Sequence, residues 1–269
     1  MTIPKLAFST LPVQHCSPDE LAALCRRHRM AAEVRCAPDG SCVMGDFPLC
    51  SVGSSICILG TESEERVAAW CEQMTSWYRD GIRGVRVFLG NFRQRKTDPA
   101  RPISPDGIRN ILCRLCECGP DVLIETHNEY ATAASLLPLL RAVDHPRLGV
   151  IWDCLHPLED GEPIGETWCR LRGYIRHIHI KDALPPTDPD AHDWVYTRLG
   201  EGAVPLRELV QMTRRDGYDG FYSLEWESAW RPELRGVCDD PDCLLDDFAA
   251  FMAEAWAASD ENADKCKCR

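Results

Sequence analysis

Residues capable of metal and acid–base chemistry lie at or near the ends of four successive apolar runs between residues 122 and 226. These residues are Glu125, Asp153, His179 and Glu225. Three carboxylates and one imidazole brought together would repel one another and lose hydration unless a cation lay between them. Oxygen-rich ligation with one nitrogen suits Mn²⁺ or Mg²⁺, with Co²⁺ and Zn²⁺ as alternatives. The four side chains therefore predict a site for one divalent metal ion, and Mn²⁺ is favoured.

Each of these side chains, taken alone, has an ordinary structural explanation. A carboxylate at the end of a strand is commonly a helix cap or a solvated rim residue, and a single histidine is more often a hydrogen-bonded core group than a ligand. The four residues, however, occupy similar positions in four successive runs. Agreement at four independent positions favours a shared site.

The apolar runs alternate with helical patterns along the chain. Strands are expected at 5–8, 32–35, 55–59, 85–89, 122–126, 149–153, 175–180 and 221–226. Several of these runs are almost continuously apolar, as in strands that are buried on both faces. Helical patterns begin at capping signals such as Ser17-Pro18 and Ser104-Pro105,. This alternation predicts an α/β fold, a single (β/α)8 TIM barrel over residues 1–258.

Two stretches depart from the repeating pattern. Residues 36–54 are rich in turn formers and lack helical periodicity, so the second helix is expected to be abbreviated or missing,. Residues 259–269 are expected to form a flexible C-terminal tail. An open doubly wound sheet is the alternative architecture, but no G-x-G-x-x-G turn follows the first strand.

The composition excludes several classes of protein. Hydrophobic residues make up 45% of the chain and charged residues 27%, which excludes a disordered or collagen-like polymer,. The net charge of −12 argues against binding to nucleic acid or anionic membranes,. The sequence shows neither a secretory signal pattern nor a long uncharged apolar stretch, so a cytoplasmic location is expected. Most of the 16 cysteines are expected to be buried or free thiols, because the Cys113-x-x-Cys116-x-Cys118 and Cys266-x-Cys268 runs lack a second pair at zinc-ligand spacing,.

An ordered set of short motifs connects the sequence to a known family. The motifs are ETHN (125–128), WDCLH (152–156), HIHIKD (177–182), LGEG (199–202) and GYDGFYSLEWE (217–227). Together they resemble the sugar phosphate isomerase/epimerase family, within the xylose isomerase-like TIM barrel superfamily. That superfamily also includes inosose dehydratases, ketose 3-epimerases and apurinic endonucleases. The resemblance implies that Glu125, Asp153, His179 and Glu225 are metal ligands and that His156 contacts substrate oxygens.

Two pairs of residues leave the assignment of ligands open. Glu225 and Glu227 share one face of a strand because side chains alternate with a period of two. The resemblance favours Glu225. His177 and His179 also share a face, and the one nearer the carboxyl end of the strand is expected to reach the metal. His177 is then expected to be packed in the interior.

Further polar residues are expected at the mouth of the barrel. Lys181 either binds a substrate oxyanion or pairs with Asp182, and the pattern does not separate these roles. His127 is an additional substrate-binding candidate, and Arg86 and Arg198 are weaker ones.

The predicted chemistry is that of a metal-dependent isomerase or epimerase acting on a sugar or related polyhydroxylated carbonyl compound. The reaction passes through an enediolate, with Glu125 and Glu225 exchanging a proton on its two faces. A dehydratase acting on an inosose- or dehydroshikimate-like compound is the alternative. An apurinic endonuclease-like phosphodiesterase ranks low, because the early strands end with almost no metal ligands. The expected partner is a small sugar-like substrate, with no nucleic acid and no membrane, and a homo-oligomer is left open.

Overall fold

Eight parallel strands close into a barrel in the computed structural model, which describes residues 4–91, 101–188 and 191–258. Around the barrel the strands follow the order β1, β10, β7, β6, β5, β4, β3, β2. Their bounds are β1 (Lys5–Ser9), β2 (Ala31–Arg35), β3 (Leu49–Ile58), β4 (Gly84–Leu89), β5 (Asp121–Glu125), β6 (Leu148–Asp153), β7 (Ile175–Ile180) and β10 (Phe221–Leu224). The predicted single TIM barrel is confirmed.

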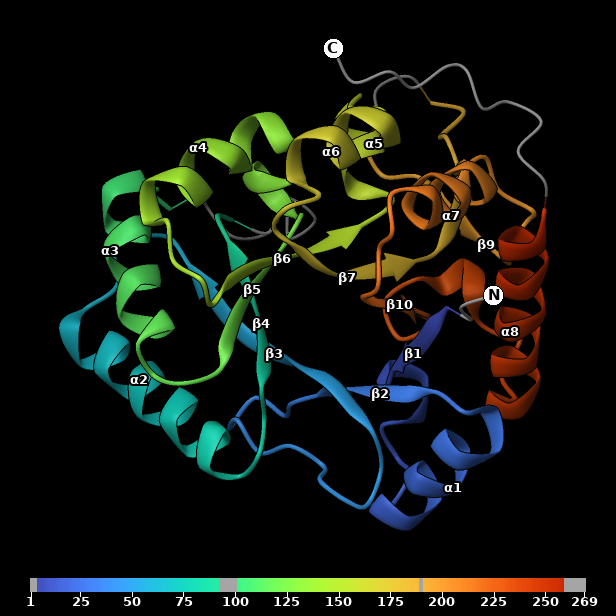
Figure 1. The fold of residues 1–269 in the computed structure, drawn as a ribbon, viewed down its shortest axis with the longest axis horizontal. Coiled ribbons are helices and arrows are strands. Elements are labelled where there is room, and N and C mark those ends of the chain that lie inside the picture. The colour runs from blue at the N-terminus through green and yellow to red at the C-terminus, as the bar shows by residue number, and fades with distance from the viewer. Residues whose placement is uncertain (1–3, 92–100, 189–190, 259–269) are drawn as a thin grey trace.

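Helices surround the strands, with α2 and α3 on the side of the barrel opposite α7 and α8 (Figure 1). The helices are α1 (Pro18–His28), α2 (Glu64–Arg79), α3 (Pro105–Cys116), α4 (Ala133–Val143), α5 (His156–Glu159), α6 (Ile164–Leu171), α7 (Leu206–Arg215) and α8 (Pro241–Ala257). Short 3-10 turns are η1 (Leu11–Val13), η2 (Asn128–Tyr130) and η3 (Pro232–Leu234). In the described part of the chain, no helix combines the length and apolar character needed to cross a membrane.

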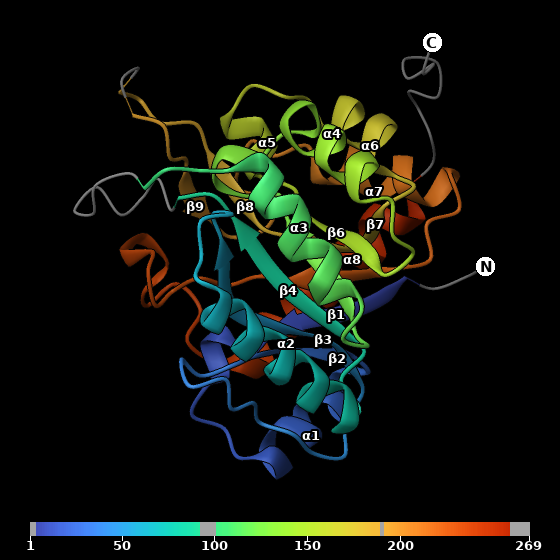
Figure 2. The same cartoon turned by 90° about the vertical axis from the view of Figure 1, so that its left-hand side faces the viewer.

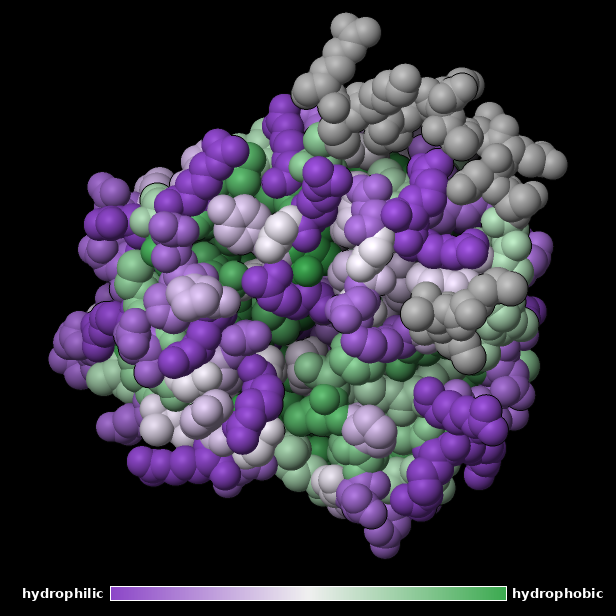
Figure 3. Space-filling model, viewed as in Figure 1, coloured by the Kyte–Doolittle hydropathy of each residue, from purple (hydrophilic) through white to green (hydrophobic). Residues whose placement is uncertain are grey.

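Local sequence signals explain where these elements begin. Ser17 accepts a hydrogen bond from the backbone of Glu20, whose side chain accepts one from the backbone of Ser17, and Pro18 occupies the first turn of α1,. Strands β4 and β6 are buried at every position because the core packs on one face and helices on the other,. Figure 2 shows α2 and α3 lying across the outside of the barrel. The face seen in Figure 3 is hydrophilic around its rim, with hydrophobic residues toward its centre.

The structure differs from the predicted elements mainly in the loops. No helix lies in residues 36–48 between β2 and β3, as expected, but β3 begins at Leu49, earlier than predicted. Helix α6 was not predicted, and neither was the antiparallel pair β8 (Asp182–Leu184) and β9 (Val195–Thr197). Both are short and flanked by turn residues, so periodicity gives little signal. Strand β10 ends at Leu224, and the predicted tail, residues 259–269, lies outside the described residues.

Candidate metal centre

Four buried side chains meet at the carboxyl ends of neighbouring strands. Glu125 ends β5, Asp153 ends β6, His179 is the penultimate residue of β7, and Glu225 directly follows β10. One ligand atom from each lies within 4.8 Å of the others. None of the four residues is more than 3% exposed. The parallel barrel therefore brings together the four residues proposed from the sequence as metal ligands.

His179 presents an unsatisfied nitrogen to the three carboxylates. Its Nδ1 lies 3.3 Å from an oxygen of Glu225, 3.8 Å from one of Asp153 and 4.0 Å from one of Glu125. This buried nitrogen nevertheless has no hydrogen-bond partner. A nitrogen surrounded by carboxylate oxygens at these distances fits a shared cation, because each ligand then directs its lone pair to one point.

Glu33 orients the imidazole of His179. The carboxylate of Glu33, on β2, lies 2.9 Å from His179 Nε2 and also accepts a hydrogen bond from the Ser223 hydroxyl at 3.0 Å. A carboxylate at Nε2 favours a proton on that nitrogen and leaves the lone pair on Nδ1. His177 Nε2 lies 3.3 Å from the same carboxylate, which places His177 in the interior and away from the three ligand carboxylates.

Glu33 was missed in the sequence, although a signal was present. It interrupts a small apolar run, Ala31-Ala32-Glu33-Val34, within a strand that is buried at all four of these positions. A carboxylate in such a strand needs a cationic or hydrogen-bonding partner on the inner face of the barrel. Glu33 lies in the middle of its strand, whereas Glu125 and Asp153 close theirs.

We expect Glu33→Gln to weaken metal binding about 10- to 100-fold, the usual effect of removing an outer-shell partner of a ligand histidine. Glutamine keeps the size of the side chain, but its amide can offer an N–H to His179 and favour the wrong tautomer. Titration of the metal-free variant with Mn²⁺ measures the effect. Glu62→Gln is a matched control, because Glu62 bonds only to the backbone of Leu59 and Gly60 in the described structure. Equal affinities in the two variants would contradict the orienting role.

Two buried cations approach the same carboxylates. Lys181 Nζ lies 2.7 Å from oxygens of both Asp153 and Glu225, and Arg86 Nη1 lies 3.0 Å from an oxygen of Glu125. Asp182 instead accepts bonds from the backbone of residues 200, 202 and 204, so Lys181 does not pair with it. Lys181 thus points into the centre, where it can also meet a substrate oxygen.

The charges at the centre determine the protonation of His179. Burial alone would lower the pKa of His179, but Glu225 and Glu33 outweigh it and raise the pKa well above its usual value. Burial likewise opposes ionisation of Glu225, yet His179 and Lys181 hold its pKa below the usual value. Burial raises the pKa of Glu125 against the opposing effect of Arg86. The carboxylates therefore favour a positive charge at His179. A proton on the imidazole supplies this charge, and a metal ion would compete with the proton for the nitrogen.

His156 and His127 form a pair beside the carboxylates. Their rings meet edge to face with centroids 4.3 Å apart. His156 Nδ1 lies 2.8 Å from Glu159, while its buried Nε2 has no hydrogen-bond partner and lies 3.8 Å from Asp153. Burial opposes protonation of His156, but the nearby charge of Asp153 raises its pKa to about 9. Both histidines therefore lie beside Glu125, at the edge of the group of four.

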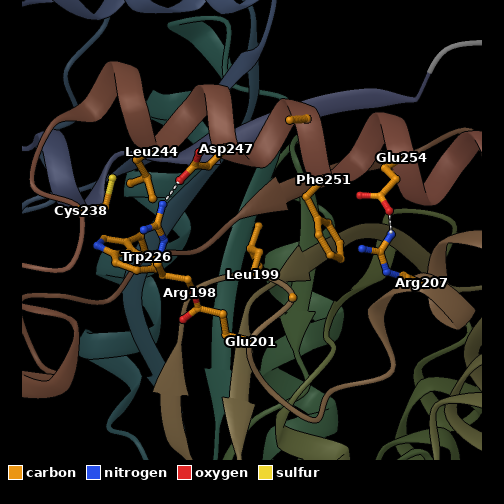
Figure 4. Close-up of a pocket in the computed structure, with 12 residues that line it drawn as sticks. Arg198, Leu199, Glu201, Arg207, Trp226, Cys238, Leu244, Asp247, Phe251 and Glu254 are labelled. Atoms are coloured by element: carbon orange, nitrogen blue, oxygen red, sulfur yellow. Dashed lines mark hydrogen bonds and ion pairs between the residues drawn. The ribbon is translucent and has the colours of Figure 1, made fainter.

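Arg198, a substrate-binding candidate in the sequence, lies outside the group formed by the four carboxylate and histidine ligands. It forms an ion pair with Asp247 of α8 and lines a separate pocket with Trp226, Cys238 and Phe251 (Figure 4). Its side chain is 42% exposed. The LGEG turn is held by Asp182, and this arrangement directs the preceding arginine toward the outer helix.

Glu227 lies at the edge of the centre. Its carboxylate accepts a hydrogen bond from Lys181 at 3.1 Å and lies 3.4 Å from Arg231 Nε. It does not belong to the group that includes Glu225. The geometry therefore favours Glu225 over Glu227 as the fourth ligand.

Comparison with known proteins identifies the family of the chain. The model of the xylose isomerase-like TIM barrel family matches residues 6–252. The chain belongs to the xylose isomerase-like TIM barrel family. Its curated relatives include two enzymes that carry out different reactions.

One relative is the 3-dehydroshikimate dehydratase of Bacillus anthracis, 31% identical over 186 residues, which are 60% of this chain and 62% of the relative. Another is the fructoselysine 3-epimerase of Escherichia coli O157:H7, 32% identical over 152 residues, which are 53% of this chain and 52% of the relative. The alignments thus span about half to three-fifths of these relatives.

The fold extends further than the sequence similarity. The IOLI protein, solved with a bound zinc atom, superimposes with a TM-score of 0.72 over 94% of this chain and 98% of its own. The two sequences are 16% identical, so this likeness shows the shared fold alone.

Proposed function

We propose that this family member is a divalent-metal-dependent isomerase or epimerase of a small polyhydroxylated carbonyl compound. The unpartnered Nδ1 of His179, facing the carboxylates of Glu125, Asp153 and Glu225, carries the proposal. These four residues would hold the ion. Mn²⁺ fits a donor set of three carboxylates and one imidazole well, and the zinc of the IOLI protein shows that a barrel of this fold accommodates a divalent ion,.

The chain's own residues supply the proton transfers. When bound, the ion would polarise a substrate carbonyl and make the C–H beside it more acidic. Glu125 and Glu225 come from strands on different sides of β6 and β7, so they can address a bound carbon from two directions. One carboxylate removes the proton and the other returns it, which inverts the carbon. Lys181 and Arg86 stabilise the negative charge that develops on substrate oxygen.

A dehydratase is the second candidate, and His156 favours it. Its buried Nε2 lies 3.8 Å from an oxygen of Asp153 and has no partner in the described structure. A protonated imidazole at this place can donate its proton to a departing hydroxyl group. The Bacillus anthracis dehydratase supports this candidate and the Escherichia coli epimerase supports the first.

Proton exchange in D₂O tests the step that both candidates share. We expect the Mn²⁺-loaded protein to introduce deuterium beside the carbonyl of a substrate, detected by NMR or mass spectrometry. A panel of ketoses, inososes and 3-dehydroshikimate covers both reactions. Retention of the hydroxyl groups identifies the epimerase, and a product lighter by one water identifies the dehydratase. A metal-loaded protein that neither exchanges a proton on any of these compounds nor removes water from one would contradict the proposed function.

A further inference from the structure

Arg35 lines a cavity on the β2 side of the barrel. It is the last residue of β2, and the cavity has a volume of about 430 Å³. Polar side chains also line this cavity: Thr10 directly after β1, Ser41 in the loop after β2, and Ser55 within β3. The cavity therefore combines a cationic group with hydroxyl groups that can donate hydrogen bonds.

The guanidinium of Arg35 has no ion pair or hydrogen bond among the described residues. The guanidinium lies over the ring of Trp230 in a cation–π contact, with Cζ 5.5 Å from the ring centroid. Arg86 and Lys181, the other cations near the centre, each contact carboxylates directly. The guanidinium of Arg35, with five donors in a planar fork, is therefore available to an anionic ligand in the cavity.

Arg35 is held close to the metal centre by the packing around β3. A Cβ on Gly53 would lie 3.3 Å from Arg86 Nη2 and 3.6 Å from Arg35 Cδ, so the two side chains flank this glycine. Arg86 in turn contacts Glu125. Arg35 thus lies on the β2–β3 side of the carboxylates, next to the arginine that contacts Glu125.

The loop that replaces the second helix shapes this cavity. A disulfide joins Cys36 to Cys42, and Ala37 N donates a hydrogen bond to the backbone oxygen of Ser41 at 2.8 Å. The backbone N–H of Arg35 donates to the hydroxyl of Thr10 at 2.9 Å. These bonds fix the backbone on both sides of Arg35 and leave its side chain directed at the cavity.

The charge of Arg35 persists at neutral pH. Burial and the neighbouring Arg86 lower its pKa to about 10, which still leaves the group protonated. Glu33, Glu125 and Glu225 lie near enough to influence this pKa, but none of them forms an ion pair with Arg35. A cation bound by the carboxylates would offset their charge and leave Arg35 more strongly in need of an anion.

We propose that Arg35 and its cavity form a subsite for an anionic substituent of the substrate, a carboxylate or a phosphate. This inference rests on the proposed function, because it states that the polyhydroxylated substrate of the metal centre carries an acidic group. The chain carries a net charge of −12, so an anion is drawn to this position by a local cation and not by the field of the whole molecule,. The planar fork of arginine suits both oxyanions.

Binding of matched charged and neutral compounds tests the subsite. Two pairs are titrated calorimetrically into the Mn²⁺-loaded protein: shikimate with its methyl ester, and fructose 6-phosphate with fructose. We expect the charged member of at least one pair to bind about 10- to 100-fold more tightly, the range expected for hydrogen bonds to a charged group. Arg35→Gln removes this preference and Arg35→Lys keeps part of it. The pair that responds distinguishes a carboxylate from a phosphate.

Controls separate this proposal from the proposed function. Arg109→Gln removes an exposed arginine that bonds only to Asn110 in the described structure, and it should keep the full preference. The subsite is wrong if neither pair shows a preference for charge, or if Arg35→Gln retains it. If the protein prefers the charged compound but catalyses neither deuterium exchange nor loss of water, the proposed function is contradicted and the anionic subsite is not.

Discussion

Replacing His179 with alanine is expected to abolish stoichiometric metal binding. The wild-type chain should bind about one divalent ion, whereas His179→Ala should weaken binding by more than the roughly 100-fold that loss of an outer-shell partner can cause. The substitution removes the one nitrogen in the group and leaves three buried carboxylates to repel one another,. Elemental analysis after dialysis against micromolar Mn²⁺ measures the ion content, and deuterium exchange should fall with it.

His177→Ala is the matched control for this experiment. His177 lies two residues earlier on the same face of β7, is equally buried, and contacts Glu33 instead of the three ligand carboxylates. We expect this variant to keep one ion per chain. Loss of the ion from His177→Ala together with its retention by His179→Ala would reverse the assignment on β7. Circular dichroism of both variants shows whether the barrel itself survives.

The barrel and the convergence of four residues could be predicted from the sequence because both follow from simple periodicity. Strands buried on both faces appear as continuous apolar runs, and a polar residue that closes such a run is conspicuous. Parallel strands place all their carboxyl ends at one rim of the barrel. Their positions in the strands were therefore enough to group Glu125, Asp153, His179 and Glu225 without any measured distance. The structure then added the distances and the orientation of His179.

Residues whose roles depend on neighbours far away in the sequence could not be assigned in this way. Glu33 acts through His179, which lies 146 residues away in the chain. The two meet because the barrel closes, with β1 between β2 and β10 and with β7 next to β10. Arg35 gains its significance from the absence of a partner, which no motif encodes. Arg198 pairs with Asp247 of α8, and its loop is held by Asp182; periodicity predicts neither contact.

The choice between Glu225 and Glu227 leads to the second large effect. We expect Glu225→Gln to lower the rate of deuterium exchange at saturating Mn²⁺ by about 10²- to 10⁴-fold, the usual contribution of a general acid or base. Glutamine keeps the shape of the side chain but cannot accept the proton. It also removes the negative charge of the carboxylate oxygen that lies 2.7 Å from Lys181 Nζ. Exchange into a substrate identified from the panel provides the measurement.

Glu227→Gln tests the alternative directly, because it makes the same chemical change two residues further along the chain. The side chain of Glu227 is 17% exposed and lies between Lys181 and Arg231, outside the ligand group. Its loss should leave metal content unchanged and slow exchange by less than about tenfold, in keeping with a weakened ion pair near the surface. A larger loss in Glu227→Gln than in Glu225→Gln would transfer the role of base to Glu227. The distances to His179 argue against that outcome, because Glu225 lies 3.3 Å from Nδ1 and shares the buried group of four.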